Sequence, residues 1–464
     1  MSDISTRIAT NSPRAGRRRL LLCVAAVVSL LAFHTPTRAA ETKKELTAEQ
    51  RQKNLASFEL IWKTVRDSHY DPKLGGVDWE AVRTELRPSL EKARSMDDAR
   101  EVIDEMLGRL GHSHVAIIPA SLYEDMQGSS AKGKIRKASQ QAVPGFDIRM
   151  ADGEPVVVQV SAGSAAAKAG VRPGWRISKI NGESLAPMLA RIRKALDRPS
   201  RVPLVQASAV LWRLHGEEGK EVSVTFLDGA GKEVTRSITL AKPKGNLVQL
   251  GQLPPTHVHF ESRKVDCDIA YFHFNFFLDP LRVMKAFGDT VQENLKAGGF
   301  VLDLRGNPGG IAGMAPGLGG WFVDRPNLKL GTTTYRNGFH HFVINPREAT
   351  YQGPLAILVD EFSMSTSEIM ASGLQGLKRA RIFGTRTPGA ALPSYFLELP
   401  NGDRLQYVVG DYVSVNGKRL EGEGVHPDEV VPLDRKALLA GHDPALDAAV
   451  RWIRSQRGSS NTQQ

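Results

Sequence analysis

Cysteine is nearly absent from this sequence: the 464 residues contain two, Cys23 and Cys267. Cys23 lies in an N-terminal apolar stretch that we expect to be removed, so the working chain would keep one thiol and form no intrachain disulfide. The stretch VDCDIAYFHF indicates a strand, in which we expect Cys267 to pack as an inert apolar side chain. Stability must therefore come from hydrophobic cores, and the chain is long enough for two to four domains.

Long hydrophobic runs are also scarce, and the one at the N-terminus is short. It is LLLCVAAVVSLLAF, residues 20–33, whose 14 residues are too few to span a bilayer comfortably. Basic residues (RAGRRR) precede it and small residues (TRAA) follow it, as in an export signal cleaved near Ala39 or Ala40. The Arg17-Arg18 pair also permits twin-arginine export, and an uncleaved anchor is the alternative. Because no later segment is apolar enough to span a membrane, we expect a periplasmic or secreted protein.

Blocks of basic residues with interleaved aromatics are missing, which argues against nucleic-acid binding. The formal net charge of +11 falls to +6 without residues 1–40, which carry six arginines and one aspartate. Metal-binding spacings such as HExxH are missing too, and GNPGG (306–310) lacks the Gly-Lys-Ser/Thr ending of a phosphate loop. We therefore expect no metal, nucleotide or other cofactor.

Hydrophobic periodicity divides the chain into regions of different character. Helical spacing dominates at first, short β-runs such as VVVQV follow, and strand and helix patterns then alternate. Because such alternation is typical of a mainly parallel sheet, the predicted fold class is multi-domain α/β. The stretch VPLVQASAVLWRLHGEEGK (202–220) fits no single pattern. The expected regions are a signal peptide (1–40), an N-terminal helical region (41–126), a β-rich domain (143–245) and an α/β domain (250–455).

Hydroxyl side chains crowd one strand-to-helix junction, VDEFSMSTSEIMASGLQ (359–375). The apolar run PLAILV before it predicts a strand, and EIMASGLQGL predicts a helix. A helix start needs only one hydroxyl as its N-cap, so the others indicate that the turn presents a nucleophile. A serine on such a turn exposes its Oγ at the carboxyl end of the sheet.

Two stretches resemble the C-terminal processing protease and tricorn family of serine peptidases. They are GFVLDLRGNPGG (299–310) and FSMSTSEIMASGLQ (362–375), and shorter matches at LGRLGHSHV and LEGEGVHPDEVV extend the resemblance. It implies a mainly parallel core of the ClpP/crotonase-like type and hydrolysis of peptide bonds by the middle serine of the triplet, Ser365.

Physical chemistry assigns roles to the neighbours of this serine. The amide of Thr366, with that of Gly309 or Gly310, would stabilise an oxyanion, helped by the positive end of the following helix. The other two serines of the triplet, Ser363 and Ser367, keep ordinary structural roles. We expect Asp303 and Arg305, at the end of the first motif, to form a structural ion pair.

A serine nucleophile needs a base, and here the sequence departs from much of the family. Many members carry a lysine in a T-x-G-K stretch about 25 residues downstream, where this chain has Thr387-Pro388-Gly389-Ala390. Lys378 is near in sequence, but we expect it to be a solvated charge. The missing lysine leaves two alternatives open: a serine–lysine enzyme with a displaced lysine, or a non-catalytic protein that binds peptides or small apolar ligands on the same scaffold.

The tricorn-like branch of the family resembles this chain better. It uses a serine–histidine pair from the helical region and a glutamate near the C-terminus, which correspond here to Ser113, His114 and Glu421. An imidazole with a pKa near neutrality suits proton transfer from Ser365, so His114 is the expected base in a Ser-His-Ser-Glu tetrad. Spacing alone does not separate His114 from His112, two residues away, or Glu421 from Glu423.

The segment SAGSAAAKAGVRPGWRISKING, within residues 143–245, resembles a PDZ domain. Such domains add an extended peptide to a sheet edge and capture its terminal carboxylate in a loop. The loop is expected at Gly145, Phe146, Asp147 and Ile148. The expected partners are polypeptide substrates, gripped in some cases by their C-terminal tails; a plain spacer that shapes access to the site is the alternative. The sequence does not indicate an oligomeric state.

Overall fold

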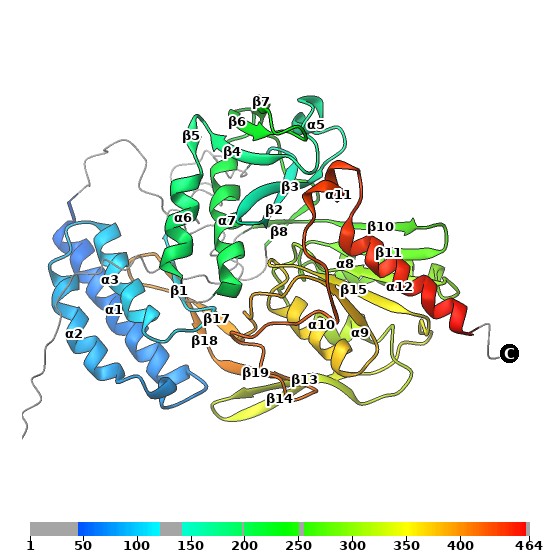
Figure 1. Ribbon diagram of the computed structural model, residues 1–464. Coiled ribbons are helices and arrows are strands. Elements are labelled where there is room, and N and C mark those ends of the chain that lie inside the picture. The colour runs from blue at the N-terminus through cyan, green and yellow to red at the C-terminus, as the bar shows by residue number, and fades with distance from the viewer. Residues whose placement is uncertain (1–44, 121–141, 197–198, 250–254, 461–464) are drawn as a thin grey trace, which may run out of the picture.

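The computed structural model describes residues 45–120, 142–196, 199–249 and 255–460. Figure 1 shows three bodies around a common centre: a helical region, a PDZ-like domain above it, and an α/β domain that ends in the red C-terminal helix. The predicted signal peptide lies outside the described residues.

The helical region begins each of its helices with a side-chain cap. Thr47, Asp78 and Ser95 each accept a hydrogen bond from a backbone amide in the first turn. Apolar side chains at helical spacing then form one core between the helices. The short strand β1 (Ala116–Ile118) leaves this core and pairs with β18, far along the chain. The helices are α1 (Ala48–Ser68), α2 (Trp79–Glu91) and α3 (Met96–Gly108).

The PDZ-like domain contains an antiparallel sheet in the order β2-β3-β4-β6-β7. Its third helix, α7, is the stretch that fitted no single pattern. Most of α7 is buried, which explains why its sequence shows no polar face. The elements are β2 (Phe146–Ala151), β3 (Glu154–Val160), α5 (Ala165–Lys168), β4 (Arg176–Ile180), β5 (Glu183–Ser184), α6 (Ala186–Ala195), α7 (Val202–Leu214), β6 (Glu221–Leu227) and β7 (Glu233–Thr239).

The central sheet of the α/β domain has the order β10-β11-β12-β15-β16-β20. The first pair is antiparallel and the rest are parallel, so the predicted mainly parallel core is confirmed. Every residue of β12 and β15 is buried, as expected where helices cover both faces. The strands are β10 (Phe260–Val265), β11 (Ile269–Phe274), β12 (Gly299–Asp303), β15 (Leu355–Val359), β16 (Arg381–Gly384) and β20 (Glu429–Val430).

Helices cover the two faces of this sheet unequally. Phe300 and Ile357 point towards α8, α9 and α10, whereas Val301 and Leu358 pack against α12 on the opposite face. The helices are α8 (Pro280–Glu293), α9 (Met314–Gly319), α10 (Thr366–Gly376), α11 (Arg435–Leu439) and α12 (Pro444–Ser460). The outlying strands are β8 (Asn246–Val248), β9 (Thr256–Val258), β13 (Leu328–Tyr335), β14 (Gly338–Ile344), β17 (Ser394–Glu398), β18 (Arg404–Val408) and β19 (Gly410–Ser414).

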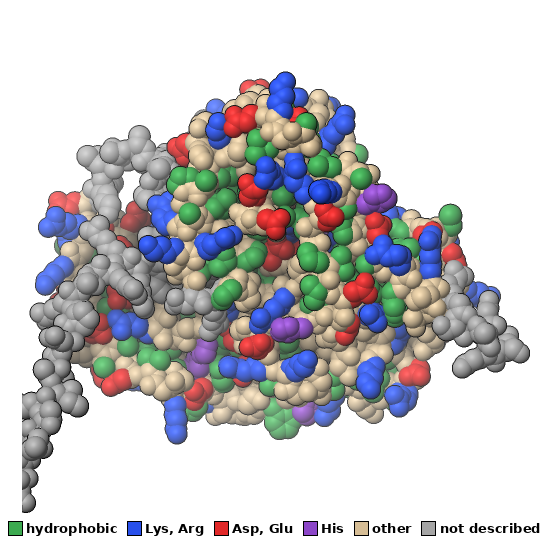
Figure 2. Space-filling model, in the orientation of Figure 1, with side chains coloured by type: hydrophobic (Ala, Val, Ile, Leu, Met, Phe, Trp, Pro, Cys, Tyr) green, Lys and Arg blue, Asp and Glu red, His purple; other side chains and the backbone are tan. Residues whose placement is uncertain are grey.

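The expectation for Cys267 was wrong. The residue lies in the turn before β11, with a φ of 60°, and it is exposed rather than packed. On the face shown in Figure 2, acidic and basic side chains are interspersed. Within the described ranges, no helix combines the length and the apolar character needed to cross a bilayer.

Candidate active site

The turn between β15 and α10 presents Ser365. All the other residues from 355 to 374 are buried, and Ser365 alone is partly exposed. Its backbone has φ 53° and ψ −114°, a conformation that a serine adopts only when its surroundings enforce it. Ser363 and Ser367 donate to the carbonyls of Leu304 and Asn307 at 2.8 Å each, which confirms their structural roles. The triplet therefore contains one outward-facing hydroxyl.

The glycine loop after β12 lies directly against this turn. A Cβ placed on Gly309 would stand 2.8 Å from the amide nitrogen of Thr366. The amide of Gly309 itself donates to Asn307 Oδ1 at 2.9 Å. No acceptor is present for the amides of Gly310 and Thr366 in the described part of the chain. Of the two glycines considered from the sequence, Gly310 is therefore the better placed to supply the second oxyanion donor.

Ser113, His114 and Glu421 form a continuous hydrogen-bonded chain. Ser113 Oγ lies 2.7 Å from His114 Nδ1 and donates to Glu421 Oε2 at 2.7 Å, and the Ser113 amide donates to Glu421 Oε1 at 2.8 Å. All three residues are buried. The tertiary structure thus joins side chains that are 308 positions apart in the sequence.

Hydrogen-bond valence assigns the tautomer of His114. A serine hydroxyl has one proton, and Ser113 gives it to the Glu421 carboxylate, so the proton on the short contact to the ring must come from His114 Nδ1. His114 Nε2 then carries a lone pair. That atom is buried and has no hydrogen-bond partner among the described residues. The ring is therefore prepared to accept a proton at Nε2.

The alternatives left open by spacing lie elsewhere. His112 stacks on His69, with ring centroids 5.1 Å apart. Glu423 pairs with Arg386 at 3.0 Å in an exposed position. Neither side chain enters the chain formed by Ser113, His114 and Glu421.

Arg201 is a member of the site that sequence reasoning missed. It ends the short turn Pro199–Arg201, just before α7, and its guanidinium donates to Glu421 Oε1 at 3.1 Å and to the Gly389 carbonyl at 3.0 Å. Burial by itself would raise the pKa of Glu421, but the charge of Arg201 and the bonds from Ser113 outweigh it and lower that pKa. For His114, burial lowers the pKa to about 4; Glu421 opposes this shift and Arg201 adds to it.

The segment that lacks the lysine connects the two halves of the site. The Ser365 amide donates to the Ala390 carbonyl at 2.9 Å, and the Gly422 amide donates to the Gly389 carbonyl at 2.9 Å. The Ser365 turn and the loop that carries Glu421 therefore contact neighbouring peptide units of this segment. Lys378 is exposed and follows α10, whose 11 residues extend about 16 Å from Ser365 at about 1.5 Å per residue. It is too far away to replace the missing lysine.

The end of β12 carries the predicted ion pair. Arg305 lies 2.6 Å from Asp303 and also binds Asp443 at the start of α12. Tyr271 donates to the same Asp303 carboxylate at 2.9 Å. This network fixes the last helix to the strand that leads into the glycine loop, so the expected structural role is confirmed.

The loop expected to capture peptide tails lies at the start of β2, an edge strand of its sheet. Phe146 and Ile148 are buried and Asp147 is exposed. Gly145 has a φ of 86°, and its carbonyl accepts from Ser164 Oγ at 3.2 Å.

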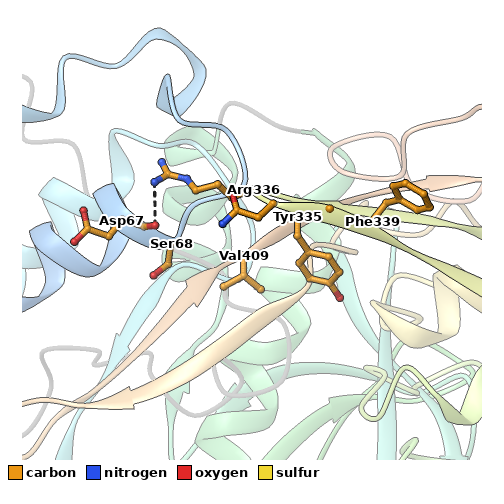
Figure 3. Close-up of a pocket in the computed structure, with 8 residues that line it drawn as sticks. Asp67, Ser68, Tyr335, Arg336, Phe339 and Val409 are labelled. Atoms are coloured by element: carbon orange, nitrogen blue, oxygen red, sulfur yellow. Dashed lines mark hydrogen bonds between the residues drawn. The ribbon is translucent and has the colours of Figure 1, made fainter.

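A separate surface pocket of about 400 Å³ lies where the end of α1 meets the β13–β14 hairpin (Figure 3). Its most prominent polar side chain, Arg336, donates to the carbonyls of Arg66, Asp67 and His69 and so caps the end of α1. None of its lining residues belongs to the chain of Ser113, His114 and Glu421 or to the Ser365 turn.

Comparison with known families matches three parts of the chain. The model of peptidase family S41 matches residues 268–431, which include Ser365 and Glu421. The model of the tricorn protease C1 domain matches residues 50–108, and that of the PDZ domain matches residues 156–205. The chain therefore resembles peptidase family S41 in its α/β domain, and the tricorn protease C1 and PDZ domains in the two regions before it. It is a serine-type peptidase, and its substrates are polypeptides.

Individual relatives have low sequence identity to this chain, but the similarity extends over most of its length. The carboxyl-terminal-processing protease of Synechocystis is 26% identical, over 80% of this chain and 79% of its own length. Carboxy-terminal processing protease CtpA of Bacillus subtilis is also 26% identical, over 74% of this chain and 66% of its own length. Tricorn protease homolog 1 of Streptomyces coelicolor is 24% identical, over 88% of this chain and 35% of its own length.

Solved structures share the fold. The photosystem II D1 C-terminal processing protease has a TM-score of 0.54 and 23% identity, over 86% of this chain and 99% of that protein. Mature CPAF, complexed with lactacystin, has a TM-score of 0.60 and 13% identity, over 89% and 99%. The arrangement of helical region, PDZ domain and peptidase core is therefore that of S41 proteases.

Proposed function

We propose that this peptidase is an exported serine endopeptidase with a Ser-His-Ser-Glu tetrad: Ser365 as nucleophile, His114 as base, and Ser113 with Glu421 behind the base. The observation that carries the proposal is the hydrogen-bonded chain from Glu421 through Ser113 to His114 Nδ1. It leaves a lone pair on Nε2, which is what a general base for a serine hydroxyl requires.

The mechanism follows from these groups. His114 Nε2 takes the proton of Ser365 Oγ as the oxygen attacks a peptide carbonyl. The tetrahedral oxyanion accepts hydrogen bonds from the amides of Thr366 and Gly310 at the positive end of α10. The imidazolium, stabilised by Glu421 through Ser113, returns its proton to the leaving amine. Water then attacks the acyl-enzyme: His114 takes a proton from the water and returns it to Ser365 Oγ as the acyl group leaves.

The substrate range and location of the enzyme are further parts of the proposal. Two relatives are named carboxyl-terminal-processing proteases. This supports action near C-terminal tails, which the loop at Gly145, Phe146, Asp147 and Ile148 would capture. Residues 1–40 contain a basic stretch, then an apolar stretch, then small residues. This order supports export and a periplasmic or secreted location.

The test of the nucleophile uses the purified mature chain and a fluorophosphonate probe. We expect the wild type to cleave an unfolded protein substrate and to be labelled at Ser365. Ser365→Ala should not be labelled, and its kcat should be at least about 10³-fold lower than that of the wild type. Undiminished cleavage by Ser365→Ala would reject the assignment. If the wild type is not labelled but binds peptides measurably, the non-catalytic alternative is supported instead.

The two histidines are a matched pair for testing the base. His114→Ala should fall to a residual rate similar to that of Ser365→Ala, because it removes the proposed acceptor of the Ser365 proton. His112→Ala should stay within about tenfold of the wild type, since His112 stacks on His69 outside the tetrad. Activity that survives loss of His114 would instead favour a displaced lysine.

A further inference from the structure

Glu368 lies in the first turn of α10, three residues after Ser365, and is fully buried. Both of its oxygens are saturated. Oε2 accepts from the amides of Ser365 at 3.1 Å and Ala390 at 2.9 Å. Oε1 accepts from Thr387 Oγ1 at 2.5 Å and the amide of Gly389 at 2.8 Å. One carboxylate therefore holds the nucleophile residue and three positions of the 387–390 segment.

The contacts continue from that segment to the other half of the site. Thr387 Oγ1 accepts from the Val425 amide at 2.7 Å, beyond the loop that carries Glu421. The Gly389 carbonyl accepts from the Gly422 amide and from Arg201, the ion-pair partner of Glu421. A set of hydrogen bonds thus joins Glu368, through the 387–390 segment, to Gly422 and Val425, which follow Glu421 in the sequence.

We propose that Glu368 is a positioning residue that fixes the nucleophile turn relative to the loop of Glu421. The proposal rests on the proposed function, because it concerns the alignment of Ser365 with the His114 side of that tetrad. Glu368 acts through the 387–390 segment and makes no contact with substrate.

The chemistry of the site demands a carboxylate. Four donors converge on two oxygens, and an ionised carboxylate is the side chain that only accepts. Burial raises the pKa of Glu368 to about 7, against the lowering effect of its hydrogen bonds, so the ionised form that the four donors require prevails above that pH. A glutamine of the same shape would turn an NH₂ group towards two of the donors. If that group faces the Oε2 donors, the Ala390 amide loses its acceptor and the Ser365 amide keeps only its bond to the Ala390 carbonyl. If it faces the other pair, Thr387 and Gly389 lose their acceptor. In either case a hydrogen bond is replaced by a repulsive contact.

The experiment compares two buried glutamates near the nucleophile. In Glu368→Gln we expect kcat to fall about 100-fold with KM within about threefold, and the rate of fluorophosphonate labelling of Ser365 to fall in parallel. Glu361→Gln is the matched control. Burial raises the pKa of Glu361 to about 7 as well, but its Oε1 binds the Met150 amide of the PDZ-like domain at 3.2 Å. Its kcat should stay within about threefold of the wild type.

A second variant keeps the test decisive if Glu368→Gln does not fold. Thr387→Val retains the carboxylate and the side-chain volume but removes the hydroxyl that links Glu368 to the Val425 amide. We expect kcat to fall about tenfold with KM unchanged. Wild-type kcat in either the Glu368 or the Thr387 variant, or an equal loss in Glu361→Gln, would overturn the positioning role. Failure of the wild type to be labelled at Ser365 would overturn the proposed function instead.

Discussion

Arg201 changes the pKa values of two residues of the proposed site without taking part in the proposed reaction. Its permanent charge lowers the pKa of Glu421, so this carboxylate remains ionised and keeps its bond to Ser113. The same charge adds to burial in lowering the pKa of His114 to about 4. A base that stays neutral at moderately acidic pH follows from this arrangement.

The pH profile tests this electrostatic account. Because burial lowers the pKa of His114, the proposed base, to about 4, the acid limb of kcat/KM should lie near pH 4 rather than near the ordinary histidine value of about 6.5. Arg201→Gln removes a charge that lowers this pKa and should move the limb to higher pH, by roughly half a unit to one unit. The measurement is kcat/KM of each variant between pH 3.5 and 8.

The control for that experiment is Arg213→Gln. Arg213 lies on α7, the helix that follows Arg201, and pairs with Glu183 at 3.3 Å near the surface. Its acid limb should coincide with that of the wild type. A wild-type limb near pH 6.5, or a limb that Arg201→Gln leaves in place, would contradict the account. The free energy of unfolding should depend on pH in the same direction. Because burial depresses the folded pKa of His114, the contribution of this residue to stability is complete above about pH 6.5 and is lost as pH falls towards 4.

At the scale of elements, the site depends on two neighbouring parallel strands. β12 and β15 are paired, so the glycine loop and the Ser365 turn that follow them lie at the same edge of the sheet. The loop approaches the turn so closely that only a hydrogen atom fits on the inner side of Gly309, which has a φ of 96°.

Gly309→Ala should therefore damage the turn rather than the sheet. The new Cβ would lie 2.8 Å from the Met364 carbonyl oxygen, the Ser365 Cβ and the Thr366 nitrogen, in a backbone region that alanine disfavours. We expect a cost of about 1–3 kcal/mol in the free energy of unfolding and a fall in kcat of about 100-fold or more, measured by urea denaturation and substrate cleavage.

Gly313→Ala is the comparison for that substitution. Gly313 precedes α9 with a φ of −63°, and nothing lies within 4 Å of its added Cβ. Its stability should be unchanged or slightly increased, with kcat near that of the wild type. Equal activity in the two alanine variants would mean that the close approach at Gly309 has no part in holding the nucleophile.

Elements with a local signature could be predicted from the sequence, and contacts between distant segments could not. The buried runs of β12 and β15, and the serine-rich turn between β15 and α10, follow from apolar patterning and turn chemistry. Arg201 lies at the edge of a helix that is too buried to show a polar face. Glu368 has the appearance of an ordinary acidic residue in a first helical turn. Their roles arise from partners 220 and 22 positions away, which no local pattern encodes.

At the scale of the whole molecule, the proposed site draws its residues from three bodies. The helical region supplies His114, the PDZ-like domain supplies Arg201, and the α/β domain supplies Ser365 and Glu421. Packing joins the bodies as well: Phe362, on the approach to the nucleophile, belongs to the hydrophobic core of the PDZ-like domain. Placement of the PDZ-like domain and geometry of the nucleophile turn are therefore physically connected.

A buried ion pair adds to that connection, beside the bond from the Met150 amide to Glu361. Arg149, on β2, donates to Asp360 Oδ2 at 2.5 Å, and its guanidinium lies 4.8 Å from the centre of the Phe362 ring. The two charged side chains are 13% and 8% exposed. Asp360 also accepts from the amides of Gly306 and Phe362, so the pair ties β2 to both loops of the site.

Arg149→Met should loosen this junction, because it leaves the buried carboxylate of Asp360 without its cation. Removing one partner of a buried pair costs about 3–5 kcal/mol, whereas an exposed pair contributes about 0–1 kcal/mol. The exposed pair of Arg176 and Glu154, 30% and 46% exposed on the same domain, provides Arg176→Met as the control. Urea unfolding should show the large loss only for Arg149→Met, together with faster amide hydrogen exchange at residues 360–364. Equal stability losses, or unchanged exchange at the turn, would mean that this ion pair does not hold the PDZ-like domain to the nucleophile turn.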